Sequence, residues 1–467
     1  MWEIRVKRKG KVKYNETMRE NAMKEKTRNE KIKNVQLTMF GTNEFPTYEE
    51  IVAEYSKEFE KYVIPKGDNI FGFWMQTLAD LELLDLELQG LADWYKIDPI
   101  KRNVELKGDI ETIRKRIAHL EIVKGRRTLY TDFIDLYGDT NAYAFHNLYP
   151  YKGKFYPRVV RTLINAFGLK EEDTILDPFN GSGTTTHEAS LMGIKSVGID
   201  ITPMGVMLAR LKNELLFLSY DDLNFSFEDF IEILKAIHSK NWSHHNKTIE
   251  NLMLVIYFDT IDAFSRTTRY NKKGKEGLFI EKFMYIKKCY EKLIRLKEKW
   301  ELKFVKADIY EGDTLELKNK HPNFKEKFDA IITSPPYYFS IDYVGKDKIA
   351  YEYLGVNMKE IESKYLGMKN TLSKKKYGNL PSKVILYYED LRKSIENMFW
   401  ALKPGGKIAI IVGDSTVGGK KIPTTMMTKK FCEEVGFKFK KLIFNPLLGA
   451  RNRAIRGESI IICEKAK

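Results

Sequence analysis

The stretch from Asp177 to Ile201 reads DPFNGSGTTTHEASLMGIKSVGIDI and decides the fold of this chain. A short β-branched apolar run, Thr174 to Leu176, precedes it, and Glu188 to Met192 has the period of a helix packed on a sheet. Ser196 to Asp200 follows as a second expected strand that ends in an acid. The order of strand, glycine turn, helix and strand predicts one unit of a doubly wound α/β sheet.

Gly181 and Gly183 lie in the turn between the first expected strand and the helix. Glycine lets the backbone pass close to a ligand, and the helix N-terminus that follows can hold a polar or anionic group. An acid at the position of Asp200 hydrogen-bonds a ribose in this kind of fold. The third glycine of the dinucleotide fingerprint is replaced by threonines at 184–186, which argues for a ligand with one nucleoside and an amino-acid tail.

The sequence DPFNGSGTT resembles the S-adenosylmethionine loop of amino-methyltransferases, which methylate exocyclic nitrogens of bases in nucleic acid. The resemblance implies a Rossmann-like methyltransferase sheet and S-adenosylmethionine as the cofactor. The cofactor-binding residues that it implies in this stretch are Asp177, Phe179, Asn180, Gly181, Ser182, Gly183, Thr184, Thr185, Asp200 and Ile201.

The same resemblance implies further cofactor contacts on both sides of this stretch. The segment HNLYPYKGKFYPR, from His146 to Arg158, contains a Tyr-x-x-Lys-Phe-x-Pro pattern that closes over the cofactor in these enzymes, although a plain connecting loop also fits its prolines and glycine. In the related enzymes an acid just beyond a later strand faces the adenine. That strand is expected at Phe304 to Asp308. Asp313 matches this acid better than Asp308 does, because Gly312 allows the turn. The matching residues of the earlier segment are Tyr151, Lys154, Phe155 and Pro157.

A second motif, TSPPYY from Thr333 to Tyr338, follows a short apolar strand expected at Phe328 to Ile332. Consecutive prolines stiffen the backbone and remove two amide donors, so neighbouring carbonyls are left to accept hydrogen bonds. A strand end shaped by proline sterics is the structural alternative. The aromatic residue directly after the prolines favours the catalytic interpretation.

The chemistry of base methylation gives each part of this motif a role. An exocyclic amine on cytosine or adenine is a poor nucleophile because its lone pair is delocalised into the ring. If the Ser334 hydroxyl and a carbonyl of Pro335 or Pro336 accept its hydrogens, the lone pair is oriented for in-line displacement. Tyr337 would stack on the target base, which must be flipped out of the duplex to be reached.

SPPY resembles the catalytic motif of the DNA amino-methyltransferases, particularly those acting on cytosine N4, whereas adenine N6 enzymes more often have an acid at the position of Ser334. The sequence therefore predicts methylation of cytosine N4 in duplex DNA, with adenine N6 in DNA or a base amine in RNA as alternatives. Methylation of cytosine C5 is disfavoured because it needs a thiolate, normally from a Pro-Cys pair, and this chain has no such pair. A DNA-binding component without turnover is the non-enzyme alternative, and the two intact motifs argue against it.

Composition sets broader limits. The 467 residues are enough for two or three units. The net charge of +15, with 79 Lys and Arg against 64 Asp and Glu, fits DNA as a partner or the charged surface of a heat-tolerant protein. Three widely spaced cysteines indicate no zinc site and no disulfide framework, so no metal is expected. Without a long apolar run or a hydrophobic leader, we expect a cytoplasmic, nucleoid-associated protein with no membrane partner.

The order of patterns predicts three regions. Residues 1–140 are expected to form a mainly helical domain, with apolar residues at helical spacing over 48–63, 71–95 and 111–123. The catalytic domain is expected at 141–204 and 304–467. The residues between, 205–303, are expected to be an inserted and mainly helical target-recognition region.

Two basic clusters are candidate contacts to nucleic acid, because cations engage phosphates and an aromatic ring can stack on a base. Solvated surface charge is the alternative for both. No nuclease constellation stands out, so a cognate restriction endonuclease would be encoded separately. The clusters contain Arg266, Arg269, Tyr270, Lys272 and Lys273 in the insertion, and Arg451 and Arg453 near the C-terminus.

Overall fold

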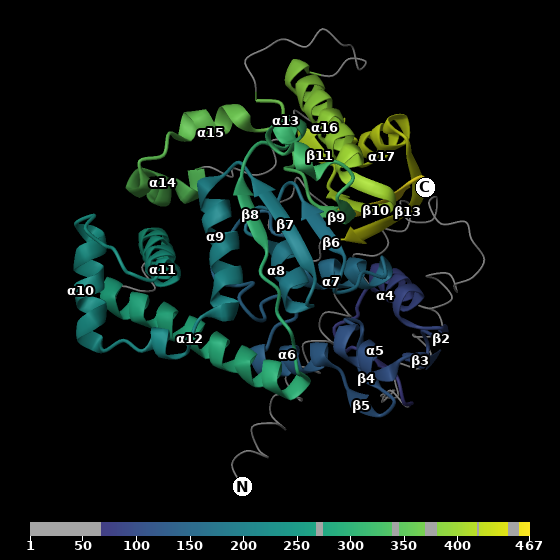
Figure 1. Ribbon diagram of the computed structural model, residues 1–467, viewed down its shortest axis with the longest axis horizontal. Coiled ribbons are helices and arrows are strands. Elements are labelled where there is room, and N and C mark those ends of the chain that lie inside the picture. Colours follow the sequence, from purple (N-terminus) through teal and green to yellow (C-terminus); the bar gives the residue numbers. More distant parts are fainter. Residues whose placement is uncertain (1–66, 268–273, 339–344, 369–380, 418–419, 447–456) are drawn as a thin grey trace. The chain divides into compact units, whose positions relative to one another are not determined.

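A seven-stranded sheet lies at the centre of the described residues, which in this computed structural model are 67–267, 274–338, 345–368, 381–417, 420–446 and 457–467 (Figure 1). Its strand order is β13-β14-β10-β9-β6-β7-β8. The strands are β6 (Thr174–Asp177), β7 (Lys195–Asp200), β8 (Asp308–Glu311), β9 (Phe328–Thr333), β10 (Leu402–Val412), β13 (Phe437–Pro446) and β14 (Gly457–Lys465).

The sheet is mainly parallel. Strands β6 to β10 pair in parallel, and β14 pairs antiparallel with both β10 and β13. The chain progresses from β6 through β7 to β8 in one direction and from β9 to β10 in the other, so the order reverses between β6 and β9. Ligands of open α/β sheets bind at the carboxyl ends of the strands at such a reversal. The predicted doubly wound α/β sheet is therefore confirmed.

Helices cover both faces of this sheet, because successive side chains of a strand point to opposite faces. Ile410 of β10 is buried in a cluster with residues of α16 and α17. Its neighbours Ala409 and Ile411 are buried in a second cluster, with residues of α4, α7 and α8. The bounds of these helices are α4 (Leu78–Leu91), α7 (Pro157–Ala166), α8 (Thr184–Leu191), α16 (Ser382–Ala401) and α17 (Thr424–Val435).

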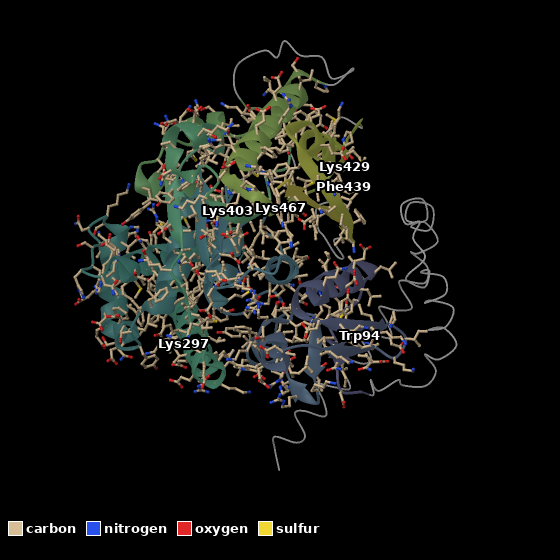
Figure 2. The ribbon with its side chains drawn as sticks, turned by 45° about the vertical axis from the view of Figure 1, so that its right-hand side comes forward. Trp94, Lys297, Lys403, Lys429, Phe439 and Lys467 are labelled. Atoms are coloured by element: carbon tan, nitrogen blue, oxygen red, sulfur yellow. The ribbon has the colours of Figure 1, made fainter. Side chains whose placement is uncertain are left out.

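Ion pairs and cation–π contacts hold the sheet and its last helix together. Lys403 of β10 forms an ion pair of 2.6 Å with Asp329 of β9. The same carboxylate accepts a hydrogen bond of 2.9 Å from the backbone of Thr174, so it links three strands. Lys429 of α17 lies over the ring of Phe439 in β13, 4.4 Å from its centroid (Figure 2).

Residues 70–137 form a second, antiparallel sheet of five strands, in the order β2-β3-β1-β4-β5. The sequence predicted helices in this part but not the sheet. Helix α4 ends at Leu91 instead of continuing to Tyr95, and the helix expected at 111–123 ends at Arg116 and is followed by a strand. The elements are β1 (Ile70–Phe71), β2 (Trp94–Asp98), β3 (Asn103–Lys107), α5 (Ile110–Arg116), β4 (Leu120–Val123), β5 (Arg126–Arg127) and α6 (Leu129–Tyr137).

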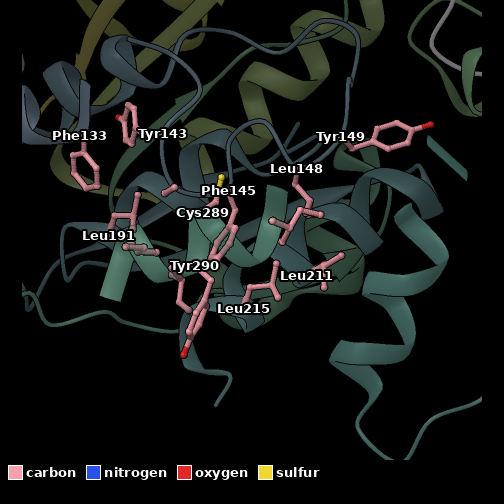
Figure 3. Packing of buried hydrophobic residues seen from close by; sticks show 14 of the residues in the cluster. Phe133, Tyr143, Phe145, Leu148, Tyr149, Leu191, Leu211, Leu215, Cys289 and Tyr290 are labelled. Atoms are coloured by element: carbon pink, nitrogen blue, oxygen red, sulfur yellow. The ribbon is translucent and has the colours of Figure 1, made fainter. Parts of the chain in front are cut away.

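A shared apolar core joins this small sheet to the catalytic region through residues 143–149 (Figure 3). The ring of Tyr143 stacks on Phe133 of α6, with centroids 4.7 Å apart. Leu148 is buried in the same cluster as Leu211 and Leu215, which lie in and just after α9. This packing fixes the start of the segment that leads to Tyr151.

Among the described residues, three α-helices lie between α9 and β8, where the sequence predicted an insertion. The sequence located α10 and most of α12 but not α11, which packs on both α9 and α12 (Figure 1). The boundary predicted at residue 205 falls inside α9, whose Val206 and Ala209 pack against Ile309 of β8. Among the described residues, no helix is long and apolar enough to cross a membrane. The bounds are α9 (Pro203–Glu214), α10 (Phe227–His238), α11 (Lys247–Arg266) and α12 (Gly274–Trp300).

Strand β8 begins at Asp308, so the strand expected at Phe304 to Asp308 is placed too early. Pairing with β7 starts only where Asp308 lies opposite Val197. Before that point the Val305 amide donates to the carbonyl of Ser190 near the end of α8 instead of to a strand. An edge strand has one partner, so that partner sets where it starts.

The position at the start of α8 requires glycine for two reasons, its backbone conformation and the close packing of a neighbouring helix. Gly183 has φ of +79°, and a Cβ there would lie 2.8 Å from the Cβ of Ala209 in α9. Gly138 has φ of +73°, but a Cβ there would meet nothing within 4 Å. We expect Gly183→Ala to lower the free energy of unfolding by about 3 kcal/mol and Gly138→Ala by only about 1 kcal/mol. Denaturant unfolding compares the two variants, and equal losses would contradict the role of the helix contact.

Candidate active site

A cavity opens to solvent at the carboxyl ends of β6, β7 and β9. The loop after β6, the end of β7, the turn after β8 and the turn after β9 all contribute to its lining, as the strand reversal requires. The lining residues that the sequence predicted for the site are Tyr151, Phe179, Gly181, Asp200, Ile201, Asp313, Ser334, Pro336 and Tyr337.

Asp200 organises the glycine loop from the end of β7. Its Oδ2 accepts a hydrogen bond of 2.7 Å from the Gly181 amide. Its Oδ1 accepts from the backbone amide of Thr202 at 2.8 Å and from the hydroxyl of the same residue. Burial raises the pKa of Asp200, and the hydrogen bonds from Thr202 and Gly181 act in the opposite direction. The carboxylate thus positions the loop before it meets any ligand.

The backbone of the loop forms a cradle that a side chain would fill. Gly181 has φ of +49°, and a Cβ on it would lie 3.3 Å from Cε1 of Tyr151 across the cavity lining. Behind the loop, a Cβ on Gly198 would lie 2.4 Å from the Asn180 side chain, and one on Gly205 would lie 3.0 Å from the Gly181 carbonyl. Glycines on both sides therefore let the backbone approach a ligand closely. This cradle, with the Asp200 carboxylate beside it, fits a nucleoside cofactor.

Asp177 ends β6 but is buried behind the cavity. Its Oδ1 accepts from the Thr333 hydroxyl at 2.6 Å and from the Phe179 amide at 3.1 Å, so it ties β9 and the glycine loop to β6. Burial raises the pKa of Asp177 to about 7, and the hydrogen bond from Thr333 opposes that shift. Within the described residues its Oδ2 has no hydrogen-bond partner. The structure therefore gives this residue a supporting position and no place in the lining.

Other residues predicted to contact the cofactor also lie behind the lining. The buried Nζ of Lys212 in α9 donates to the carbonyl of Ser182 at 2.7 Å. The Thr185 hydroxyl donates to the Ile332 carbonyl of β9 at 3.2 Å. These contacts fix the path of the loop, and they explain why polar side chains are buried here. The buried residues of this group are Asn180, Ser182, Thr184 and Thr185.

The segment predicted to close over the cofactor is held at several points. Tyr149 Oη donates to Oδ1 of Asp347 at 2.9 Å, which joins this segment to the residues after the catalytic motif. Lys154 Nζ donates to the His146 carbonyl at 2.6 Å, and burial lowers the pKa of Lys154 to about 8. Tyr151 alone of the predicted residues in this segment reaches the lining. Lys154 stabilises the loop, and Phe155 belongs to the core under the sheet.

A buried polar network lies beneath the same segment. Glu188 of α8 accepts from Tyr143 Oη at 2.6 Å, from Arg161 Nε at 3.0 Å and contacts His146 Nε2 at 2.7 Å. All four side chains are almost completely buried. Buried charges need such partners, so this network secures the start of the segment to the helix that follows the glycine loop.

Asp313 lies at the far side of the glycine loop. Its Oδ1 accepts from the Leu315 amide at 2.8 Å, which caps the short helix that begins at Thr314. The Thr314 hydroxyl donates to the Pro178 carbonyl, so this turn is attached to the loop after β6. Asp313 and Phe179 both line the cavity.

The turn from Ser334 to Tyr337 forms the opposite wall. Ser334, Pro336 and Tyr337 line the cavity, whereas Pro335 is buried behind them. The Pro336 carbonyl accepts a hydrogen bond of 3.0 Å from Oη of Tyr387 in α16. The Tyr337 hydroxyl donates to Oε1 of Glu458 in β14 at 2.8 Å. Neither partner could be found from the motif, because each is distant in the sequence and follows no local pattern.

The sequence pattern identifies one residue that supports the lining, Gly198, but it does not identify several residues of the lining itself. Gly198 interrupts an apolar strand, and a glycine inside a strand often marks a close backbone approach. No comparable pattern identifies the part of the lining near Tyr365. The lining residues that the sequence did not predict are Lys152, Gly153, Pro178, Thr202, Thr314, Lys364, Tyr365 and Leu366.

Most of the predicted nucleic-acid contacts fall outside the described residues. Arg266 is described: it ends α11 and forms an ion pair of 2.7 Å with Asp262 one turn earlier. The others, which lie in 268–273 and 447–456, are Arg269, Tyr270, Lys272, Lys273, Arg451 and Arg453.

Comparison with known proteins places this site in context. The model of a family described as DNA methylase matches residues 4–210. The Type II methyltransferase M.BsoBI of Geobacillus stearothermophilus is 24% identical over 450 residues, which cover 74% of this chain and 88% of that protein. A tRNA (guanine(10)-N2)-dimethyltransferase of Methanothermobacter thermautotrophicus is 47% identical over 51 residues, 11% of this chain and 15% of that enzyme. The rRNA methyltransferase aviRa of Streptomyces viridochromogenes aligns with a TM-score of 0.33 at 12% identity, over 70% of this chain and 94% of that structure.

The family match includes the glycine loop and Asp200, and the similarity to M.BsoBI extends over most of both chains. The cavity brings that loop together with the SPPY turn. Both motifs resemble those of the same group of enzymes, so the sequence had already linked them. The chain is therefore similar to the S-adenosylmethionine-dependent DNA amino-methyltransferases.

Proposed function

We propose that this protein is a site-specific methyltransferase that modifies the N4 amine of cytosine in duplex DNA. The observation that carries the proposal is that Ser334 and Tyr337 line the same cavity as Gly181 and Asp200. A base-activating turn and a nucleoside cradle on opposite walls fit a reaction between a bound cofactor and a base. We also propose that this protein acts in restriction and modification, because it is similar to the Type II methyltransferase M.BsoBI. The endonuclease would be a separate protein. We propose a cytoplasmic location for this chain.

The cofactor side is assigned to the glycine loop and the ends of β7 and β8. S-adenosylmethionine supplies an electrophilic methyl group on a positively charged sulfur. Asp200 would accept hydrogen bonds from the ribose hydroxyls, and Asp313 would face the adenine. Gly181 gives the methionine part room, because a side chain there would reach Tyr151. These residues hold and orient the cofactor and take no chemical part in the transfer.

The base side is assigned to the turn after β9. The Ser334 hydroxyl and a proline carbonyl would accept the two hydrogens of the amine and orient its lone pair. The Pro336 carbonyl accepts from Tyr387 with one of its two lone pairs, so the carbonyl of Pro335 or of Pro336 can be the second acceptor. Preorganised acceptors of this kind can contribute several kcal/mol to lowering the barrier, roughly 3 kcal/mol for a single group.

Cytosine is preferred over adenine because of the serine at position 334. The resemblance associates an acid at this position with adenine N6 enzymes, and the family as a whole includes both activities. Tyr337 would stack on the flipped base, since one ring face suffices to hold either base. The helices α10 to α12 and the two basic clusters are proposed to bind the duplex and select the sequence.

Methylation of a base amine in RNA is the second candidate. The 51-residue segment that is 47% identical to a tRNA (guanine(10)-N2)-dimethyltransferase favours it, because that enzyme acts on an exocyclic amine in RNA. The segment covers only 11% of this chain, whereas the similarity to M.BsoBI covers 74%. DNA is therefore the preferred substrate.

Labelled S-adenosylmethionine separates these candidates. The protein is incubated in parallel with duplex DNA from an unmodified host and with total transfer and ribosomal RNA, and each product is digested to nucleosides. We expect label in DNA alone, as N4-methylcytosine. Label only in RNA would reject DNA as the substrate, and 6-methyladenine as the only labelled nucleoside would reject cytosine.

A further inference from the structure

The catalytic tyrosine is held by a residue outside its motif. Tyr337 is 7% exposed and lines the cavity, and its Oη donates to Oε1 of Glu458 at 2.8 Å. The two residues are 121 positions apart in the sequence. Glu458 is not part of the cavity lining. Its effect on the cavity is therefore transmitted through the Tyr337 side chain.

The topology explains how Glu458 reaches the site. Strand β14 runs antiparallel to β10, with Ser459 opposite Val412 at the carboxyl end of β10. The first residues of β14 therefore lie at the edge of the sheet where the cavity opens. Glu458 itself lies opposite Asn445 of β13 in the ladder, so its backbone is fixed by strand pairing.

The hydrogen bond restricts a torsion that the motif leaves free. The prolines fix the backbone before Tyr337 but not its χ1 torsion, and each staggered χ1 well places the hydroxyl at a different point. A hydrogen bond to a carboxylate is shorter and stronger than one to a neutral acceptor. Glu458 is largely removed from solvent, and this burial raises its pKa while the hydrogen bond from Tyr337 opposes the rise. The outer end of the ring is thus held in place.

We propose that Glu458 is a positioning residue for the target base: its carboxylate orients the Tyr337 ring so that the ring can stack on the flipped base beside Ser334. This inference rests on the proposed methylation of a base amine. It assigns a role in the reaction to a residue of β14, far from both motifs.

Four variants test the role through steady-state kinetics on DNA from an unmodified host. Glu458→Leu removes the acceptor and is expected to lower kcat about ten-fold. The KM for S-adenosylmethionine and the melting temperature should stay unchanged, because Glu458 touches neither the cofactor wall nor the core. Glu458→Gln keeps an oxygen acceptor and should retain most of the activity. Glu464→Leu removes a half-buried carboxylate of the same strand, paired with Lys440, and should match the wild type.

A double-mutant cycle distinguishes an action through Tyr337 from a direct action on DNA. Tyr337→Phe removes the same hydrogen bond from the other partner, so adding Glu458→Leu to it should cause no further loss. A double variant whose loss is the product of the two single losses would overturn the proposal. Full kcat in Glu458→Leu would overturn it as well. If Glu458→Leu fails to fold, full kcat in Tyr337→Phe is the overturning result.

The wild-type protein shows which idea has failed. If label enters RNA or adenine, the proposed function is rejected, and the same variants then test Glu458 on that substrate. If the wild type labels cytosine in DNA but Glu458→Leu is fully active, the function stands and the role of Glu458 is rejected. Label in no nucleic acid would reject both.

Discussion

Ser334→Ala is expected to lower kcat for methyl transfer at least about 100-fold, because a single preorganised hydrogen-bonding group at a reacting atom is typically worth that much. The hydroxyl lies in the cavity lining at the end of β9, opposite the glycine loop. Without it the amine loses one of its two proposed acceptors, and its lone pair is no longer oriented. Single-turnover transfer from labelled S-adenosylmethionine to DNA measures the loss.

The cofactor side should be unaffected by this substitution. Binding of S-adenosylhomocysteine, measured by calorimetry, is expected to stay within about two-fold of the wild type, well under 1.4 kcal/mol. Ser363→Ala is the matched control, since its hydroxyl donates to the Glu360 carbonyl within α15 (Met358–Lys364). Full activity in Ser334→Ala would contradict the assignment of the base side.

Asp200→Asn is expected to weaken cofactor binding about 100-fold, because hydrogen bonds to a charged group are worth roughly 1.5–3 kcal/mol each. The carboxylate oxygens accept from the Gly181 amide and from Thr202. An asparagine presents an NH₂ group in place of one oxygen, so one backbone donor would face another donor. Calorimetric titration with S-adenosylhomocysteine measures the change.

A carboxylate on the neighbouring strand serves as the control. Asp308 begins β8 and is exposed, and it does not line the cavity. Asp308→Asn should therefore leave the affinity unchanged. Equal affinities of Asp200→Asn and the wild type would contradict the proposed role of Asp200 in the cradle.

The central strands could be predicted from the sequence because their signals are local. A β-branched run before a glycine turn located β6, and an apolar run before two prolines located β9. The two motifs then had to meet, because carboxyl ends of neighbouring parallel strands lie at one edge. The cavity containing both Gly181 and Ser334 follows from that rule.

The rest depends on contacts between distant parts of the chain. The strands of residues 70–137 are short, and their antiparallel pairing is not visible as a long apolar run, so helical spacing was overestimated there. Tyr387 and Glu458 act through hydrogen bonds that span 51 and 121 positions. Asp177 is buried because of the fold around it, whereas the resemblance implied contact with the cofactor.

The central claim is that the SPPY turn methylates cytosine N4 at a defined DNA sequence. Its most direct test is base-resolved detection of modified nucleotides in the DNA of an unmodified host that expresses the chain, beside the same host expressing Ser334→Ala. We expect N4-methylcytosine at one recurring short sequence with the wild type and none with the variant. DNA that contains only N6-methyladenine, or no modified base, would contradict the claim.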